Sequence, residues 1–140
     1  VEGRQIEFGI LGNEHLRVGP SCEILNHGAF VDYEGKYGKT AMPYAIPANI
    51  SSLQETLGID LAKQVYRTIG CKGLARVDFF LDGNGHYWLN EINPFPGCTD
   101  TSAFPKIWAK AGVSMCKICD DLVIYAMHKA RSLQRVVGRE

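Results

Sequence analysis

Four residues, Arg76, Asp78, Glu91 and Asn93, have side chains of the types that hold metal ions and phosphate groups. Carboxylate and amide oxygens suit a hard cation such as magnesium, which keeps several water ligands and recruits phosphate oxygens. A carboxylate between two such ions can bridge them, and a guanidinium can neutralise the charge that grows on a transferring phosphoryl group. The alternative interpretation is a cross-strand ladder of ion pairs on a solvated face of a sheet, which needs no ligand.

A β-hairpin is expected to bring these four residues together. Residues 73–81 alternate like a strand, Asp82-Gly83-Asn84-Gly85 is a strong turn signal, and residues 86–92 make the return strand. Strand side chains alternate between two faces, so Arg76 and Asp78 share a face. The same alternation predicts one shared face for Leu89, Glu91 and Asn93. The two sets then meet across the hairpin, and the bulky apolar residues of the first strand place it inside the sheet.

The remaining elements predict an α+β fold with an antiparallel β-sheet and flanking helices. Strands are expected at residues 5–12 and 15–25, and a long irregular stretch, typical of a functional lid, at about residues 26–49. Apolar residues recur at helical spacing in three further segments. Helices are therefore expected at about residues 51–69, 104–111 and 114–132. At the start of the first helix, Ser52 and Glu55 are placed to form a capping box.

The composition indicates a folded chain with no general attraction to nucleic acid or membranes. Of the 140 residues, 46% are hydrophobic and 21% are charged, which allows a packed core. Trp88 and Trp108 are expected in that core. The 15 Lys and Arg residues balance the 15 Asp and Glu residues, and no apolar run reaches the roughly 18 residues of a membrane span. The five cysteines are odd in number and irregularly spaced, which favours reduced thiols in a cytoplasmic protein.

Three motifs give the sequence a resemblance to a known family. They are Gly73-Leu74-Ala75-Arg76-Val77-Asp78, Leu89-Asn90-Glu91-Ile92-Asn93 and Pro96-Gly97-Cys98-Thr99. Together they resemble the C-terminal part of the ATP-grasp ligases, and most closely that of the D-alanine–D-alanine ligases. The resemblance extends over nearly the whole chain and implies the C-terminal subdomain of an ATP-grasp domain.

The resemblance implies roles for the hairpin residues. Asp78, Glu91 and Asn93 would ligate magnesium, with Glu91 bridging two ions, and manganese is a conceivable substitute. Arg76 would stabilise the transferring phosphoryl group and the tetrahedral intermediate that follows. Asn90, beside the bridging glutamate, would line the nucleotide.

The loop after the hairpin resembles the part of the family's site that holds the second substrate. Gly97 would offer its backbone N–H to the oxyanion of the intermediate. Ser102 would hold the carboxylate of the second D-alanine; its alternative role is that of a helix N-cap before Phe104. Pro94 and Ala103 differ from residues common in the family, which leaves D-serine open as a second substrate.

Two further parts of the sequence resemble nucleotide-binding segments of the family. Lys36 would contact the γ-phosphate and Tyr37 would shield the substrate pocket in a mobile loop, because an exposed acyl phosphate would be hydrolysed. An ordinary solvated loop is the alternative for this pair. Gln5 occupies the position of a glutamate that binds the nucleotide ribose, and Glu7 lies two residues later on the same strand face. Either of them, or neither, would serve the ribose.

The resemblance implies an ATP-dependent, ADP-forming enzyme that joins two D-alanines through an acyl phosphate for peptidoglycan precursor synthesis. A cytoplasmic homodimer is implied for the full-length parent. Because Ile6, Phe8 and Ile10 already alternate like an interior strand, the sequence is expected to be a fragment that lacks its N-terminal part. Ligases of this family also need an N-terminal substrate domain and the first half of the ATP-grasp domain, so the resemblance implies that the fragment alone does not turn over. The alternatives are another ATP-grasp carboxylate–amine ligase, such as a D-alanine–D-serine ligase, and a non-catalytic nucleotide-binding fragment.

Overall fold

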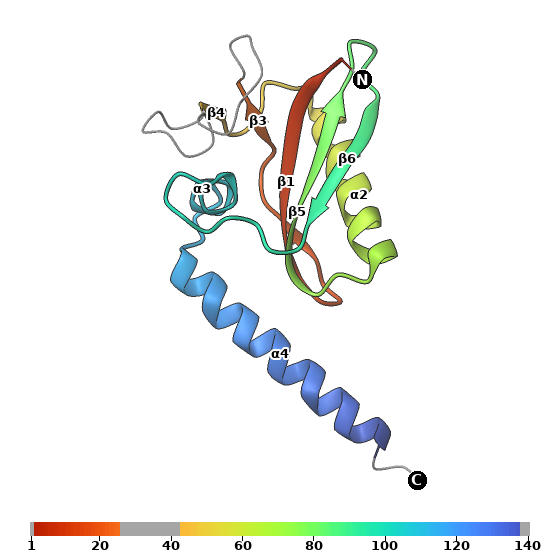
Figure 1. Ribbon diagram of the computed structural model, residues 1–140, viewed down its shortest axis with the longest axis vertical. Helices are drawn as coiled ribbons and strands as arrows, with labels where there is room; N and C mark the ends of the chain where they lie inside the picture. Colours follow the sequence, from red (N-terminus) through yellow and green to blue (C-terminus); the bar gives the residue numbers. More distant parts are fainter. Residues whose placement is uncertain (1, 26–42, 138–140) are drawn as a thin grey trace.

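The computed structural model describes residues 2–25 and 43–137, which form one antiparallel sheet with helices on both faces (Figure 1). Five of its strands follow the order β4-β3-β1-β5-β6, and β2 pairs with β1 beside that path. The strands are β1 (Arg4–Gly12), β2 (Arg17–Val18), β3 (Cys22–Ile24), β4 (Tyr44–Ala45), β5 (Gly73–Leu81) and β6 (Tyr87–Asn93). The helices are α2 (Ser52–Ile69), α3 (Ala103–Lys110) and α4 (Met115–Val137). This arrangement confirms the predicted α+β class.

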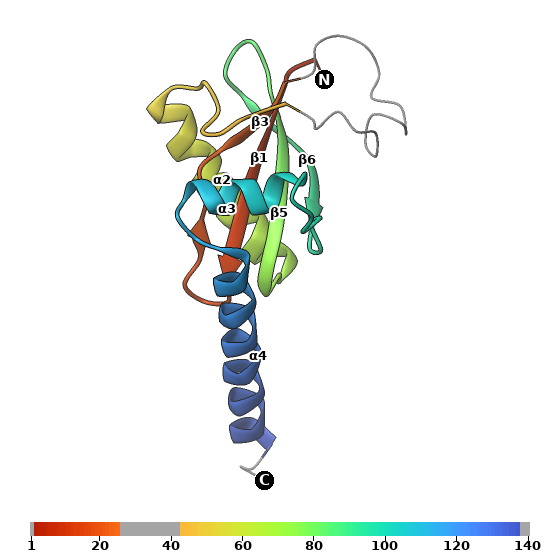
Figure 2. The same cartoon turned by 90° about the vertical axis from the view of Figure 1, so that its left-hand side faces the viewer.

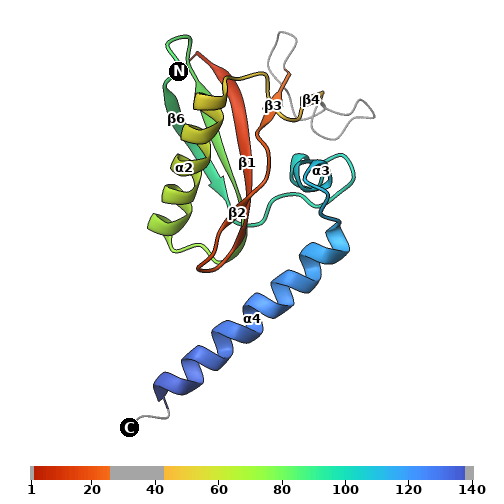
Figure 3. The same ribbon diagram turned by 180° about the vertical axis from the view of Figure 1, so that it is seen from behind.

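One face of the sheet carries the main core, which α2 covers (Figure 3). Strands β1 and β5 pair over their whole length, from Arg4 opposite Leu81 to Gly12 opposite Gly73. Every second residue of both strands therefore points toward α2 and is buried away from water. The residues of this core include Ile6, Phe8, Ile10, Val77, Phe79 and Leu81 from the strands and Ala62 and Tyr66 from α2. The long β1–β5 ladder makes these two strands the rigid centre of the fold.

On the opposite face of the sheet lie α3 and the start of α4 (Figure 2). Leu11 of β1 packs there with Phe104 and Trp108 of α3. Gly9 lets α3 approach closely, because a Cβ atom at this position would lie 3.0 Å from Trp108 Nε1 and 3.3 Å from the ring of Phe104. The same face also carries the carboxylates of Glu7 and Asp78, which are almost fully buried.

Helix α4 extends away from the sheet, and its last turn lies far from the β5–β6 turn (Figure 1). Its first turns are attached to the rest of the chain. Ile118 is fully buried against α3, Asp121 forms an ion pair with Arg17, and the Tyr125 carbonyl accepts a hydrogen bond of 3.1 Å from Asn13. Within the described residues, no helix combines the length and apolar character needed to cross a membrane.

Several local expectations need correction. The capping box of α2 is formed by Ser51 and Gln54, because the Ser51 hydroxyl accepts from the Gln54 N–H and the Gln54 side chain accepts from the Ser51 N–H. Glu55, expected in that role, accepts a 2.9 Å hydrogen bond from the Ser21 N–H instead. The stretch expected to be irregular from residue 26 to residue 49 contains β4, and its residues 26–42 lie outside the described part. The last helix continues to Val137, beyond the expected end near residue 132.

Candidate functional site

A β-bulge in the hairpin determines which residues of β6 lie beside Arg76 and Asp78. Phe79 pairs with Leu89, but Asp78, the residue just before Phe79 in β5, pairs with Glu91. Asn90 therefore has no partner across the ladder, and the bulge shifts the register by one residue. Without that shift, Asn90 would lie opposite Asp78, and Glu91 would point toward α2.

The bulge corrects two expectations about β6. Leu89 does not share a face with Glu91, because it pairs with Phe79 on the α2 side of the sheet. Trp88 is not a core residue: it pairs with Phe80 and its side chain is 50% exposed. Trp108, the other tryptophan, is buried as expected.

The guanidinium of Arg76 lies among three carboxylates. Its Nε and Nη2 donate hydrogen bonds to the two oxygens of Asp78, at 2.8 and 2.6 Å. Its Nη2 is also 3.7 Å from Glu91 Oε1, and its Nε is 3.3 Å from Glu7 Oε2. When all four groups are ionised, two negative charges remain uncompensated. This polar cluster of Glu7, Arg76, Asp78 and Glu91 is therefore suited to attracting a cation of charge two.

Burial makes the uncompensated charge unfavourable in the absence of a cation. Glu7 is 1% exposed and lies opposite Asp78 in the β1–β5 ladder. Burial, and then the neighbouring Asp78 carboxylate, raise the pKa of Glu7 to about 7. Burial also raises the pKa of Asp78, although the hydrogen bonds from Arg76 oppose this effect. Burial lowers the pKa of Arg76, but the hydrogen bond to Asp78 and the charge of Glu7 outweigh it, so the net shift is upward.

Asn93 lies next to Arg76 in the ladder and begins the loop that leads to α3. Its side-chain oxygen accepts a 3.1 Å hydrogen bond from the Phe95 N–H, which fixes the start of that loop. Among residues 2–25 and 43–137, no three His, Cys, Asp or Glu side chains lie close enough to form a metal site by themselves. A metal ion at this cluster would therefore use the two carboxylates of the hairpin and the Asn93 amide, and take further ligands from water or phosphate.

The loop before α3 brings Gly97 and Ser102 into contact. A Cβ atom at Gly97 would lie 2.6 Å from Ser102 Oγ, so only glycine fits there without displacing the serine. Ser102 stands at the N-cap position of α3, but its side chain makes no capping hydrogen bond. Its hydroxyl instead lies 2.8 Å from the Thr99 hydroxyl, and its N–H donates to the Thr99 carbonyl. The serine hydroxyl is thus held in place by the loop.

The two residues proposed for the ribose are hydrogen-bonded to each other but have different surroundings. Gln5 is half-buried and lines a pocket of about 280 Å³ together with Phe80 and Leu25. Glu7 points into the polar cluster, and its Oε1 accepts a 3.3 Å hydrogen bond from Gln5. The link between Glu7 and Arg76 was not foreseen. The available signal was a charged residue between Ile6 and Phe8 in an otherwise apolar strand.

Of the remaining residues expected to contact the nucleotide or the substrate, the structure describes only Asn90. Asn90 is exposed at the bulge. Lys36 and Tyr37 lie outside the described residues.

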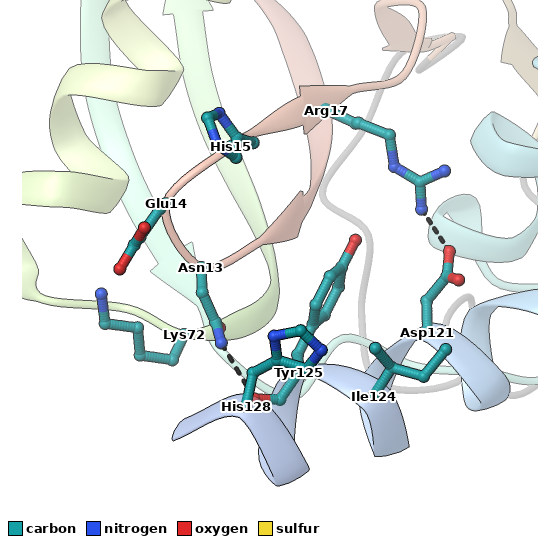
Figure 4. A pocket seen from close by; sticks show the side chains of 9 residues that line it. All are labelled: Asn13, Glu14, His15, Arg17, Lys72, Asp121, Ile124, Tyr125 and His128. Carbon is teal, nitrogen blue, oxygen red and sulfur yellow. Dashed lines mark hydrogen bonds and ion pairs between the residues drawn. The ribbon is translucent and has the colours of Figure 1, made fainter. Parts of the chain in front are cut away.

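A larger pocket, of about 740 Å³, lies away from the polar cluster, between the β1–β2 turn and α4 (Figure 4). Two interactions connect residues of the β1–β2 region to α4 at this pocket. They are the Arg17–Asp121 ion pair and the hydrogen bond from Asn13 to the Tyr125 carbonyl. Of the residues expected to do chemistry, none that the structure describes lines this space. The polar cluster, which contains Arg76, Asp78 and Glu91, is therefore the better candidate for a reactive site.

Comparison with protein families and solved structures agrees with the geometry. Residues 1–124 match the family described as D-ala D-ala ligase C-terminus. A D-alanine–D-alanine ligase from Solibacter usitatus is 38% identical over 135 residues, which are 96% of this chain and 42% of that protein. The chain thus spans less than half the length of this relative.

Two solved structures have the same fold. The D-alanine–D-alanine ligase from Coxiella burnetii is 27% identical with a TM-score of 0.83, and the match covers 99% of this chain and 36% of that one. The VanG D-Ala:D-Ser ligase from Enterococcus faecalis is 32% identical with a TM-score of 0.75, and the match covers 88% of this chain and 36% of that one.

Proposed function

The chain belongs to the D-ala D-ala ligase C-terminus family, and from this membership we propose that it forms the metal- and phosphate-binding end of an ATP-dependent D-alanine–D-alanine ligase. The observation that carries the proposal is the guanidinium of Arg76 among three carboxylates, two of them almost fully buried. A buried excess of negative charge beside a cation that can face phosphate matches the needs of phosphoryl transfer. The reaction would join two D-alanines through an acyl phosphate and release ADP, for peptidoglycan precursor synthesis.

The metal site would consist of Asp78, Glu91 and Asn93, with Glu91 bridging two magnesium ions. These ions, or manganese in their place, would neutralise the phosphates of ATP. The oxygen donor set fits a hard cation, and Glu91, whose side chain is 57% exposed, is open to a ligand. Arg76 would contact the transferring phosphoryl group from within the sheet face.

The remaining roles are distributed around the hairpin. Gln5 would bind the ribose and Asn90 would line the nucleotide, while Lys36 and Tyr37 would close over the phosphate and the substrate. The Gly97 N–H would stabilise the oxyanion. Ser102 would hold the carboxylate of the second substrate, and its contact with Gly97 supports this pairing of roles.

The wider assignment rests on the same family membership. Residues 1–140 would be the C-terminal part of an ATP-grasp domain, and the substrate-binding and adenine-binding parts would come from other residues of the full-length protein. We place that protein in the cytoplasm as a homodimer.

The test is ligation by the complete polypeptide encoded by the reading frame, supplied with ATP, magnesium and D-alanine. D-alanyl-D-alanine and ADP should form in equal amounts. Glu91→Ala should lower kcat by about 100-fold or more, because the bridging carboxylate is lost. Glu14→Ala, an exposed glutamate in the β1–β2 turn, serves as the matched control. Full activity of the Glu91 variant would rule out this mechanism.

A D-alanine–D-serine ligase is the second candidate, and the 32% identity to the VanG D-Ala:D-Ser ligase favours including it. A panel of amino acids offered as second substrate separates the two. A kcat/KM for D-serine above that for D-alanine would select the second candidate, and phosphate release only with unrelated amines would point to another ATP-grasp ligase.

A further inference from the structure

We propose that Glu7 is a positioning residue that holds the Arg76 guanidinium in place when Asp78 binds a metal ion. This inference rests on the proposed function, because it assumes that Asp78 is a magnesium ligand. It assigns to Glu7 a role that neither ribose binding nor a simple ion-pair ladder would give it.

Asp78 cannot fully serve both a metal ion and Arg76. Both of its carboxylate oxygens accept hydrogen bonds from the guanidinium, at 2.8 and 2.6 Å. A magnesium ion binds carboxylate oxygen at about 2.0–2.1 Å in near-octahedral geometry. Such an ion weakens the oxygens as acceptors and repels the guanidinium, so Arg76 needs another acceptor to keep its position.

Glu7 Oε2 is that acceptor. It is buried, has no hydrogen-bond donor among the described residues, and lies 3.3 Å from Arg76 Nε. The other oxygen, Oε1, is occupied by Gln5 at 3.3 Å. A buried polar atom without a partner typically costs about 1–3 kcal/mol, so a small turn of Arg76 toward Oε2 is favourable once Asp78 engages the metal.

The burial of Glu7 argues against contact with ribose. Glu7 is 1% exposed and lies in the interior of the sheet, between Cys22 of β3 and Asp78 of β5. Gln5, two residues earlier on the same face, is less buried and lines a pocket. The geometry thus gives Gln5 the contact with a ligand and Glu7 the contact with Arg76.

The kinetic test compares Glu7→Leu, Glu7→Gln and Gln5→Ala in the complete polypeptide, each with ATP and with 2′,3′-dideoxy-ATP. Leucine keeps the volume of Glu7 but cannot accept a hydrogen bond, and glutamine keeps an acceptor. Glu7→Leu should lower kcat about 10- to 100-fold with little change in KM, equally for both nucleotides, because a misplaced catalytic group slows the chemical step. Glu7→Gln should recover most of this loss. Gln5→Ala should raise KM for ATP but not for the dideoxy nucleotide.

The second readout does not depend on turnover. In protein labelled with ¹⁵N-arginine, the Nε–H signal of Arg76, assigned through Arg76→Lys, reports how firmly the group is held. Without metal, exchange of this proton with water should be slow in wild type and in Glu7→Leu, because Asp78 accepts from it. With Mg²⁺ and ADP it should remain slow in wild type and become at least tenfold faster in Glu7→Leu.

Equal exchange rates in wild type and Glu7→Leu with Mg²⁺ and ADP would overturn the role of Glu7. So would a Glu7→Leu defect confined to KM for ATP and absent with the dideoxy nucleotide, which would indicate ribose binding. Glu7→Ala repeats both measurements if the leucine variant fails to fold. A wild-type protein that neither ligates D-alanine nor binds Mg²⁺ with ADP would refute the proposed function itself.

Discussion

The Asp82 carboxylate stabilises the β5–β6 turn through three hydrogen bonds. Its Oδ2 accepts from the indole N–H of Trp88 at 3.0 Å, and its Oδ1 accepts from the backbone N–H groups of Asn84 and His86, each at 2.9 Å. The bond from Trp88 and then the bond from His86 favour the charged form most. They lower the pKa of Asp82 from 3.8 to about 2.

The folded protein should therefore lose stability when Asp82 is protonated. Because the pKa is lower in the folded state, the contribution of Asp82 is complete above about pH 4 and is lost as the pH falls toward 2. Asp82→Asn should make the free energy of unfolding less dependent on pH in this range, as measured by urea unfolding at several pH values. Asp60→Asn, exposed on α2, is the control and should keep the wild-type slope. Parallel curves for Asp82→Asn and wild type would contradict the assignment.

At the level of single residues, the sequence predicted that an arginine and carboxylates would lie together on one face of the hairpin. It did not predict every residue that forms the polar cluster. Strand alternation alone placed Arg76 and Asp78 on one face, because that relation is local. Glu7 was missed as their partner, since the register of β1 against β5 is set by tertiary pairing and is not encoded in either strand alone. The roles of Asp78, Glu91 and Asn93 in metal binding stay predictions.

Helix α2 shows how packing between elements overrides local preference. Gly58 lies within the helix, where glycine is a poor helix former. A Cβ atom there would lie 2.4 Å from Cζ of Phe8 and 3.0 Å from Cζ of Tyr87. The glycine therefore allows α2 to approach the aromatic residues of the sheet.

Gly58→Ala should destabilise the protein despite the better helix propensity of alanine. Propensity favours alanine by about 1 kcal/mol, whereas overpacking a dense core typically costs about 1–3 kcal/mol and forces Phe8 to move. We expect a net loss in the free energy of unfolding by urea, with Gln64→Ala, on the exposed side of the same helix, close to wild type. A stabilised Gly58→Ala protein would mean that α2 sits farther from the sheet than described.

The elements themselves were predictable where the signals are local. The turn at residues 82–85 and the helices follow from residue type and spacing. The choice of Ser51 over Ser52 as the N-cap was not predictable, because a serine is a favourable N-cap residue at either position. The hydrogen bond from Ser21 draws Glu55 away from the capping box. The bulge at Asn90 also has no sequence signature, since its position depends on how Glu91 meets Asp78 across the hairpin.

For the molecule as a whole, the layers follow from apolar residues on both faces of β1. One face packs on α2, and the other packs on α3 and the start of α4 around Leu11. Alternation in β1 and helical spacing in the segments after residue 100 predict helices on the sheet. They do not predict that α3 and the buried carboxylates of Glu7 and Asp78 share one face of the sheet.

The attachment of α4 should depend on its buried side and not on its outer side. Ile118 is fully buried with Phe104 and Trp108, whereas Val123 is 60% exposed. Ile118→Ala should lower the free energy of unfolding by about 2–4 kcal/mol, because it removes buried methyl groups and leaves a cavity. Val123→Ala should change it by less than about 0.5 kcal/mol. Equal effects of the two changes would show that α4 is not packed as described.

The unpaired Asn90 divides β6 into two segments whose odd-numbered residues point to opposite faces of the sheet. Before it, the odd-numbered Tyr87 and Leu89 pair with residues on the α2 side, and after it, the odd-numbered Glu91 and Asn93 belong to the opposite side. If residues 87–93 formed a regular strand with Asn90 present, Glu91 would turn toward the core and Ile92 toward Arg76. Function in this hairpin therefore depends on the bulge as well as on the identity of its residues. A relative that lacks the residue at position 90 would be expected to keep Glu91 opposite Asp78 on a strand without a bulge, because the remaining pairs would then be consecutive.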